Sequence, residues 1–197
     1  MRKLGMQIPG KERKKYLLAA AILFFAFVNP YVEALEFSQP VPYMFAHYAL
    51  FVSGMLLGYA IFRLPRVLTL LAAMLSVFWH LPYPFALAAS LWPFRILSEA
   101  SFLIAGILLG ASLPLLTWRT KGILLGLWVF ADNLLSVIFI LAPDYYSSQG
   151  INISPYQNLQ FPLLGLTMLL LMNSLVGVVV YAYTRRMVAT IRSAGAD

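Results

Sequence analysis

The sequence predicts an all-α, polytopic membrane protein: a bundle of about six transmembrane helices with both termini in the cytoplasm. Three observations predict it. The 197 residues are 61% hydrophobic and 11% charged, with a mean hydropathy of +0.82, whereas soluble domains carry about 25% charged residues. Six apolar stretches approach the length of about 20 residues that a membrane-spanning helix needs. Lysine and arginine gather in alternate connections between these stretches. The composition excludes a soluble enzyme, because one soluble core would leave large apolar patches in water.

Five of the six predicted spans are apolar runs bounded by charged or polar residues or by prolines. The first span is Tyr16–Leu35, with a bend expected at Asn29-Pro30 because proline interrupts the helical hydrogen bonds. The second span is Tyr43–Arg63. The last three spans carry few polar residues and follow one another as Ile96–Trp118, Gly122–Pro143 and Phe161–Thr184.

The third span is shorter than the others. It begins as Val67–His80 and runs into the apolar stretch Leu81–Phe94, which contains Pro82, Pro84 and Pro93. Prolines at this density break a regular helix. We therefore expect a partly embedded loop or a short interfacial helix there, serving either as a plain turn or as the lining of a site.

Basic residues give the orientation. Of the 14 lysines and arginines, all but Arg95 fall on one side of a six-span arrangement, and that side is expected to be cytoplasmic. We therefore expect a basic cytoplasmic segment over residues 1–15, a membrane domain over residues 16–184 in the lipid bilayer of the cell membrane, and a basic cytoplasmic tail over residues 185–197. The net charge of +7 then reports topology and predicts no nucleic-acid partner.

The N-terminus also permits a second interpretation, a cleaved signal peptide. Lys11–Lys15 would be its basic region, Tyr16–Val28 its apolar region, and Val32-Glu33-Ala34 loosely fits a cleavage site. Cleavage would leave five spans and an external N-terminus.

An offset of 52 residues aligns His47–Gly58 with Glu99–Gly110, so that both glycines of a GxxxG pattern coincide. The offset predicts a parallel two-helix repeat, with spans two and three repeated as spans four and five. Small residues four apart let helix backbones approach closely in lipid. His47 and Glu99 lie on the same helix faces as these glycines, so we expect both to face protein.

The ionisable residues within the spans are the main functional signal. His47, His80, Glu99 and Asp132 all fall in the half of the bilayer away from the basic connections, and Glu33 is expected near its surface, in reach of water. Ionisable residues inside a membrane are functional candidates by default. We expect the first four to converge on one metal site, with the alternative that they form structural clips between helices.

Imidazole and carboxylate ligands suit copper, zinc or iron. Met44, three residues before His47, is a weaker candidate for a soft ligand, because methionine in membrane helices usually serves packing. Two histidines can also hold a haem from both sides, which makes His47 and His80 its candidate ligands here, and ionisable chains can relay protons. The sequence has no HExxH, GxSxG or P-loop pattern and no cysteine, so we expect no enzyme.

Two runs carry a family resemblance. His80–Ala88 and Leu97–Gly106, together with Met44-Phe45-Ala46-His47, resemble the multi-pass assembly factors of caa3-type cytochrome c oxidase, the CtaG-like group. The resemblance covers about a third of the chain, Met44–Gly110. It implies a part in maturing a haem–copper oxidase, around copper, with a terminal oxidase as partner.

The chain departs from that family in having fewer histidines, with Glu99 where one is expected, and six spans in place of seven. It is similar to a short, divergent archaeal branch of unassigned function. We therefore expect a membrane assembly or accessory factor that binds copper through His47 and His80, with Glu99 and Asp132 as further ligands or as partners that orient the imidazoles. The alternatives are a structural or haem-binding subunit of a larger membrane complex, and a small transporter.

Overall fold

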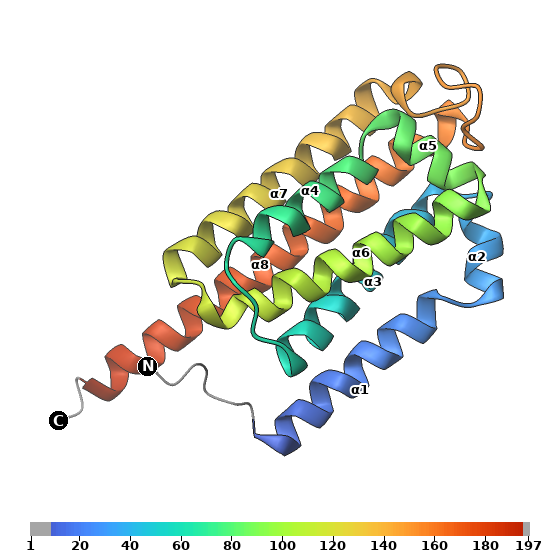
Figure 1. The fold of residues 1–197 in the computed structure, drawn as a ribbon. Helices are drawn as coiled ribbons and strands as arrows, with labels where there is room; N and C mark the ends of the chain where they lie inside the picture. The colour runs from blue at the N-terminus through green and yellow to red at the C-terminus, as the bar shows by residue number, and fades with distance from the viewer. Residues whose placement is uncertain (1–8, 195–197) are drawn as a thin grey trace.

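The computed structural model describes residues 9–194 and is all-α over that range, as predicted (Figure 1). Arg2 and Lys3, and the side chains of Arg186 and Arg192, which belong to the predicted basic segments, lie outside the described part. The helices in chain order are α1 (Gly10–Phe27), α2 (Pro30–Glu36), α3 (Pro40–Ile61), α4 (Leu68–Trp79), α5 (Pro82–Ser90), α6 (Trp92–Ser112), α7 (Trp118–Leu141) and α8 (Phe161–Ala194).

The number of spans agrees with the prediction of about six. Within the described residues, α3, α6, α7 and α8 are each long and apolar enough to cross a membrane. Two further spans are obtained if each bent pair counts as one: α1 with α2, which bend by 58°, and α4 with α5, which bend by 72°.

The first bend has the local cause that the sequence predicted. Pro30 is the first residue of α2, and the Asn29 side chain caps that helix by accepting hydrogen bonds from the backbone N–H groups of Tyr31 and Val32 at 3.2 and 3.1 Å. Both features favour a new helix start. The chain therefore ends α1 and begins α2 in a new direction within three residues.

The second bend lies in the proline-rich stretch. Pro82 opens α5, one of the two forms expected there, and α6 follows almost directly. Phe85, Ala86, Ala88 and Ala89 are fully buried. The segment is therefore a short helix packed inside the protein, and its prolines lie in first turns, where their missing N–H groups cost little.

The 52-residue offset relates other spans than predicted: spans one and two correspond to spans three and four, and the predicted correspondence of span three with span five is wrong, because α7 is one unbroken helix. In the structure, helix–bend–short helix–long helix occurs twice, as α1–α2–α3 and as α4–α5–α6. Helix α1 packs on α3 as α4 packs on α6, and each short helix packs on its own long helix. Adding 52 to the numbers of the first residues of α2 and α3 gives the first residues of α5 and α6. Helices α7 and α8 pack against each other outside the repeat.

The two long helices of the repeat cross through their glycines. A Cβ added at Gly54 would lie 2.1 Å from the carbonyl oxygen of Leu103, and one added at Gly106 would lie 2.1 Å from that of Phe51. In the same way, a Cβ added at Gly58 would meet the carbonyl oxygen of Ile107, and one added at Gly110 would meet that of Met55. Each contact thus has its counterpart 52 residues away, the reciprocity expected of two like units paired about a two-fold axis. The glycine faces pack against protein, as predicted.

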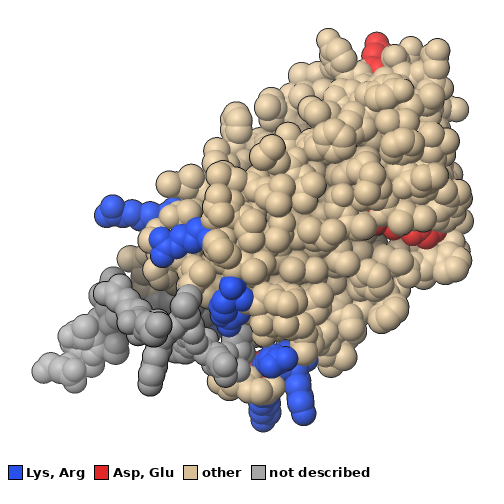
Figure 2. Space-filling model, viewed as in Figure 1, with Lys and Arg blue, Asp and Glu red and all other residues tan. Residues whose placement is uncertain are grey.

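The surface is divided along the length of the bundle. On the face in Figure 2, basic side chains occupy one end, acidic side chains the other, and uncharged residues the region between. We call these the basic end and the distal end. The distal end is formed by α2, α5 and residues 142–160 (Figure 1). Between the basic end and the distal end, large apolar side chains such as Phe25 and Phe130 are exposed, as expected of helices in contact with lipid.

Candidate functional site

The buried and half-buried ionisable residues within the spans of the described chain lie toward the distal end and form three groups. The structure places His47 beside His80, Glu99 beside Glu33 and Glu36, and Asp132 beside Tyr48. The four residues expected to share one site are therefore distributed over separate contacts.

The first group is the histidine pair. His47, on α3, is 2% exposed, and its ring lies 6.2 Å from that of His80, centroid to centroid. His80 directly follows the last residue of α4, and its Nδ1 donates a hydrogen bond to the Ser76 carbonyl oxygen at 2.6 Å. Because a carbonyl only accepts, this bond places the proton on Nδ1 and leaves the Nε2 lone pair free for a ligand.

His47 lies between two aromatic rings. Tyr43 is 4.1 Å away, edge-on, and Phe102 is stacked at 4.2 Å, both measured between ring centroids. Within residues 9–194 neither ring nitrogen of His47 has a hydrogen-bond partner. Since an unpaired buried polar atom costs about 1–3 kcal/mol, this imidazole is a candidate ligand for a metal ion.

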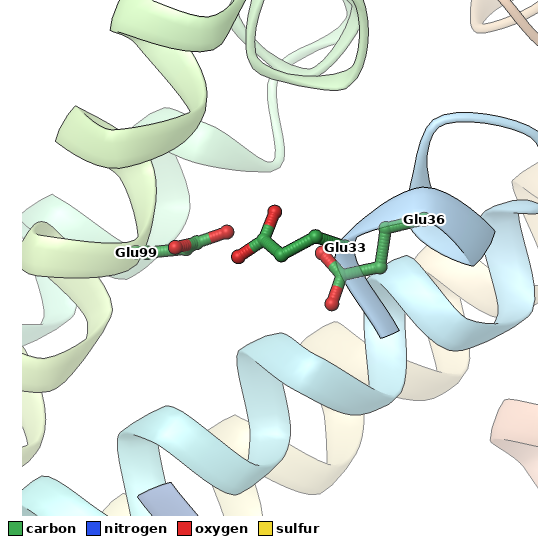
Figure 3. A group of neighbouring side chains, drawn as sticks. All are labelled: Glu33, Glu36 and Glu99. Atoms are coloured by element: carbon green, nitrogen blue, oxygen red, sulfur yellow. The ribbon is translucent and has the colours of Figure 1, made fainter. Parts of the chain in front are cut away.

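The second group is a set of three carboxylates. Glu33 and Glu36 lie one turn apart on α2, and Glu99 comes from α6 (Figure 3). One carboxylate oxygen from each lies within 4.8 Å of the others. The expectation that Glu33 reaches water is wrong: it is 9% exposed, because the bend at Asn29 turns this face of α2 toward α6.

Arg95 is the cation of this group. Its Nη1 donates to Glu36 Oε2 at 2.5 Å, and both side chains are buried. Its other groups donate to the carbonyl oxygens of Ala88 at 2.9 Å and Ala89 at 3.0 Å. The guanidinium carbon lies 4.4 Å from the ring centre of Phe37 and 4.4 Å from that of Tyr43. Arg95 therefore joins the ends of the short helices from both repeat units.

Asp132 forms the third group with Tyr48. The Tyr48 hydroxyl donates to one Asp132 carboxylate oxygen, which joins α7 to α3. The other oxygen has no partner among the described residues. The neighbouring Asn133 accepts a hydrogen bond at 3.0 Å from Asn173 of α8. Asp132 thus lies where three helices are held together by polar contacts.

Residues 142–160 cover the distal end. The Tyr156 hydroxyl donates to the Glu36 backbone carbonyl, and the Tyr146 hydroxyl donates to the His80 carbonyl at 2.8 Å. Burial raises the pKa of Tyr146 to about 12 and also raises the pKa of Tyr156. Both phenols therefore stay neutral donors at ordinary pH, and each fixes the backbone next to one of the buried groups.

Sequence reasoning missed Glu36 and treated Arg95 only as the exception to the charge pattern. A signal for both was present. Arg95 is the one basic residue expected at the distal end, and Glu33 and Glu36 are one helical turn apart after a helix-starting Asn-Pro. A lone cation in an apolar setting requires a nearby anion.

Comparison with known proteins identifies one family. Residues 18–186 match the family described as "Protein of unknown function (DUF1404)". This match includes all three buried groups. No curated protein matches the chain, and no solved structure matches it.

Proposed function

The chain belongs to the DUF1404 family, and from its buried residues we propose that it is a membrane accessory factor in the maturation of a haem–copper oxidase, with His47 and His80 binding copper. The proposal rests on one observation above all: the buried imidazole of His47 lies beside the half-buried imidazole of His80, and His47 has no hydrogen-bond partner within residues 9–194. The resemblance of Met44–Gly110 to oxidase assembly factors supports the choice of metal and partner.

The residues present fit a copper ion. Neutral imidazole suits copper, and the bond from His80 Nδ1 to Ser76 is the kind of second contact that orients a metal-binding histidine. When bound, the ion would be held for delivery to an oxidase. The protein would hold the two imidazoles neutral, shield the ion from water with Tyr43 and Phe102, and release it.

Haem is a weaker candidate for the same pair. A haem held from both sides would need a wide slot between the histidines. Tyr43 and Phe102 pack against His47 at about the closest spacing of aromatic rings. The ring centroid of His80 also lies 5.4 Å from that of Phe102. A haem would have to displace this aromatic packing.

We further propose that the distal end faces the outside of the cell and that both termini are cytoplasmic. The exposed basic residues of the described chain lie at the other end, and lysine and arginine mark the cytoplasmic side. In this orientation the histidine pair would accept copper from the extracytoplasmic side.

The test measures copper in the protein and activity in the membrane. The detergent-purified chain is loaded with Cu(I) under anaerobic, reducing conditions and competed with a Cu(I) chelator. We expect one copper per chain in the wild type and at least a tenfold weaker affinity in His47→Ala and in His80→Ala. The same variants are expressed in the host lacking this chain, and oxidase activity and oxidase copper content should fall.

Tyr48→Phe is the matched control, because it removes a polar group from the same helix outside the histidine pair. It should keep full copper affinity. A folded wild type that binds no copper would overturn the copper site, and a Soret band lost in the histidine variants would replace it with haem. Unchanged oxidase activity in the host without this chain would overturn the accessory role.

The repeat favours one other function, a small transporter. Repeated units with broken helices that meet at ionisable residues are characteristic of secondary transporters. Copper or manganese uptake by proteoliposomes containing the purified chain would favour this function over the accessory role.

A further inference from the structure

The set of three carboxylates carries a negative charge that the neighbouring residues do not balance. Glu33, Glu36 and Glu99 lie together with one guanidinium, that of Arg95. With all three acids ionised, the group carries a net charge of about −2. An uncompensated charge away from water costs several kcal/mol, so the folded protein requires either bound protons or a bound cation here.

Each carboxylate has a buried oxygen without a hydrogen-bond partner. Within the described chain these atoms are Glu33 Oε2, Glu36 Oε1 and Glu99 Oε1. The Glu36 side chain is 1% exposed, and its other oxygen is used by Arg95. Figure 3 shows the Glu33 and Glu99 carboxylates pointing toward one another, with Glu36 beside them. An unpartnered, fully buried carboxylate oxygen thus adjoins two others.

We propose that Glu33, Glu36 and Glu99 bind one hard divalent cation, of the Mg²⁺, Mn²⁺ and Ca²⁺ class. Oxygen ligands without nitrogen or sulfur select these ions. A spread of 4.8 Å or less among the three oxygens lets one ion contact all of them, since such bonds are about 2.0–2.6 Å long. One divalent ion with Arg95 makes the group neutral.

Arg95 is a positioning residue in this site. It holds Glu36 Oε2, and its own place is fixed by the Ala88 and Ala89 carbonyls and by two aromatic rings. Glu36 is therefore presented with one oxygen committed and one free. Glu99 is only half-buried, so the ion can approach from the side of α6.

The site is distinct from the proposed copper site. It uses oxygen ligands from α2 and α6, whereas the histidine pair belongs to α3 and the end of α4. Within the described residues, three or more possible metal ligands come close enough to share an ion only at Glu33, Glu36 and Glu99, and this set includes neither histidine. The two sites differ in both location and preferred metal.

The experiment uses Mn²⁺ as the probe on the full chain in detergent, after treatment with EDTA. Binding is followed by titration calorimetry and by the loss of the free Mn²⁺ signal in electron paramagnetic resonance. We expect one Mn²⁺ per chain, a rise in the unfolding temperature with Mn²⁺, and a loss of affinity of at least tenfold in Glu33→Gln and in Glu99→Gln. Both changes keep side-chain volume and leave the Arg95–Glu36 pair intact.

Asp132→Asn is the matched control, because it also neutralises one buried carboxylate outside the group. It should retain one Mn²⁺ per chain, as should the double variant His47→Ala/His80→Ala. A folded wild type that binds none of Mn²⁺, Ca²⁺ and Mg²⁺ would overturn the site, and so would unchanged affinity in Glu33→Gln and Glu99→Gln. In either case protons balance the charge. Copper binding is measured separately, so the failure of one site leaves the other standing.

Discussion

At the scale of single residues, Arg95 organises the distal end. It is fully buried, pairs with Glu36, binds two backbone carbonyls and lies between the rings of Phe37 and Tyr43. Arginine suits this position because its planar fork donates in several directions at once and stacks on aromatic faces. The contacts compensate for the cost of removing the charge from water.

Arg95→Met should destabilise the protein by about 3–5 kcal/mol, because it leaves Glu36 buried without its cation. Arg95→Lys keeps the charge but loses the forked contacts, and an intermediate loss is expected. Thermal unfolding in detergent measures both. Arg119→Met, at an exposed position of the basic end, should stay within about 0.5 kcal/mol of the wild type. Equal stability of Arg95→Met and Arg119→Met would refute this account.

The candidate residues were predictable by type but not by partner. Their rarity in apolar spans marked His47, His80, Glu99 and Asp132, and helical periodicity placed His47 and Glu99 on faces turned toward protein. Helical periodicity cannot predict the direction that the chain takes after a helix break, however. The direction of α2 after its 58° bend decides that Glu99 meets Glu33 and Glu36, and that angle depends on packing beyond the Asn-Pro signal.

At the scale of elements, the crossing of α3 and α6 is the central contact of the fold. Four glycines leave no space for a side chain between the two backbones, and each helix serves as the surface against which the other packs. Close packing of small residues is a main source of helix association in lipid, where no hydrophobic driving force acts between helices.

Gly110→Ala should destabilise the bundle by about 1–3 kcal/mol, because the new Cβ would lie 2.0 Å from the Met55 carbonyl oxygen and force the backbones apart. Gly126→Ala on α7 is the control. A Cβ there meets no described atom within 4 Å, and the change should stabilise its helix by about 0.5–1 kcal/mol. Unfolding midpoints compare the two. A neutral Gly110→Ala would contradict the observed crossing.

Tyr146→Phe removes the hydrogen bond to the His80 carbonyl and should cost about 0.5–1.5 kcal/mol. It should also change the response to alkali. Since burial raises the pKa of Tyr146 from 10.0 to about 12, its contribution is fully present below pH 10 and is lost as the pH rises through 12. Unfolding midpoints between pH 8 and 12 should therefore fall less steeply in the variant. Identical slopes would show that this phenol is not responsible.

The repeat shows what pattern alone could establish about elements. The offset of 52 residues and the pairing of glycine faces were predictable, because GxxxG spacing is visible in the sequence. The true unit includes α1–α2 and α4–α5, which share no comparable sequence signal. Glu33 and Glu36 on α2 correspond to Phe85 and Ala88 on α5, so similarity of shape persists where similarity of chemistry does not.

At the scale of the whole molecule, the bundle has a basic end, an apolar surface and a distal end closed by residues 142–160. Composition and the distribution of lysine and arginine were sufficient to predict this division. The count of spans was also predictable, because the bilayer fixes helix length. The way in which two of the spans break required the structure.

The absence of cysteine from the sequence allows the proposed orientation to be tested with single cysteines. Leu159→Cys, at a distal position 88% exposed, should react with an impermeant maleimide on intact cells. Trp118→Cys, at a position 85% exposed near the start of α7, should react only after permeabilisation. The reverse pattern would invert the orientation, and labelling of both on intact cells would reject the span count.

Arg95 also has a consequence for how the two proposed sites communicate. Its guanidinium holds a carboxylate of one site and, through Ala88 and Ala89, the end of the helix that begins just after His80. A ligand that draws Glu36 away from Arg95 would weaken the contact that Arg95 makes between α2 and the end of α5. By thermodynamic reciprocity, if a divalent ion alters copper affinity by some factor, copper alters the affinity for that ion by the same factor. Measuring copper affinity with and without Mn²⁺ therefore tests whether the two proposed sites are coupled through the buried arginine.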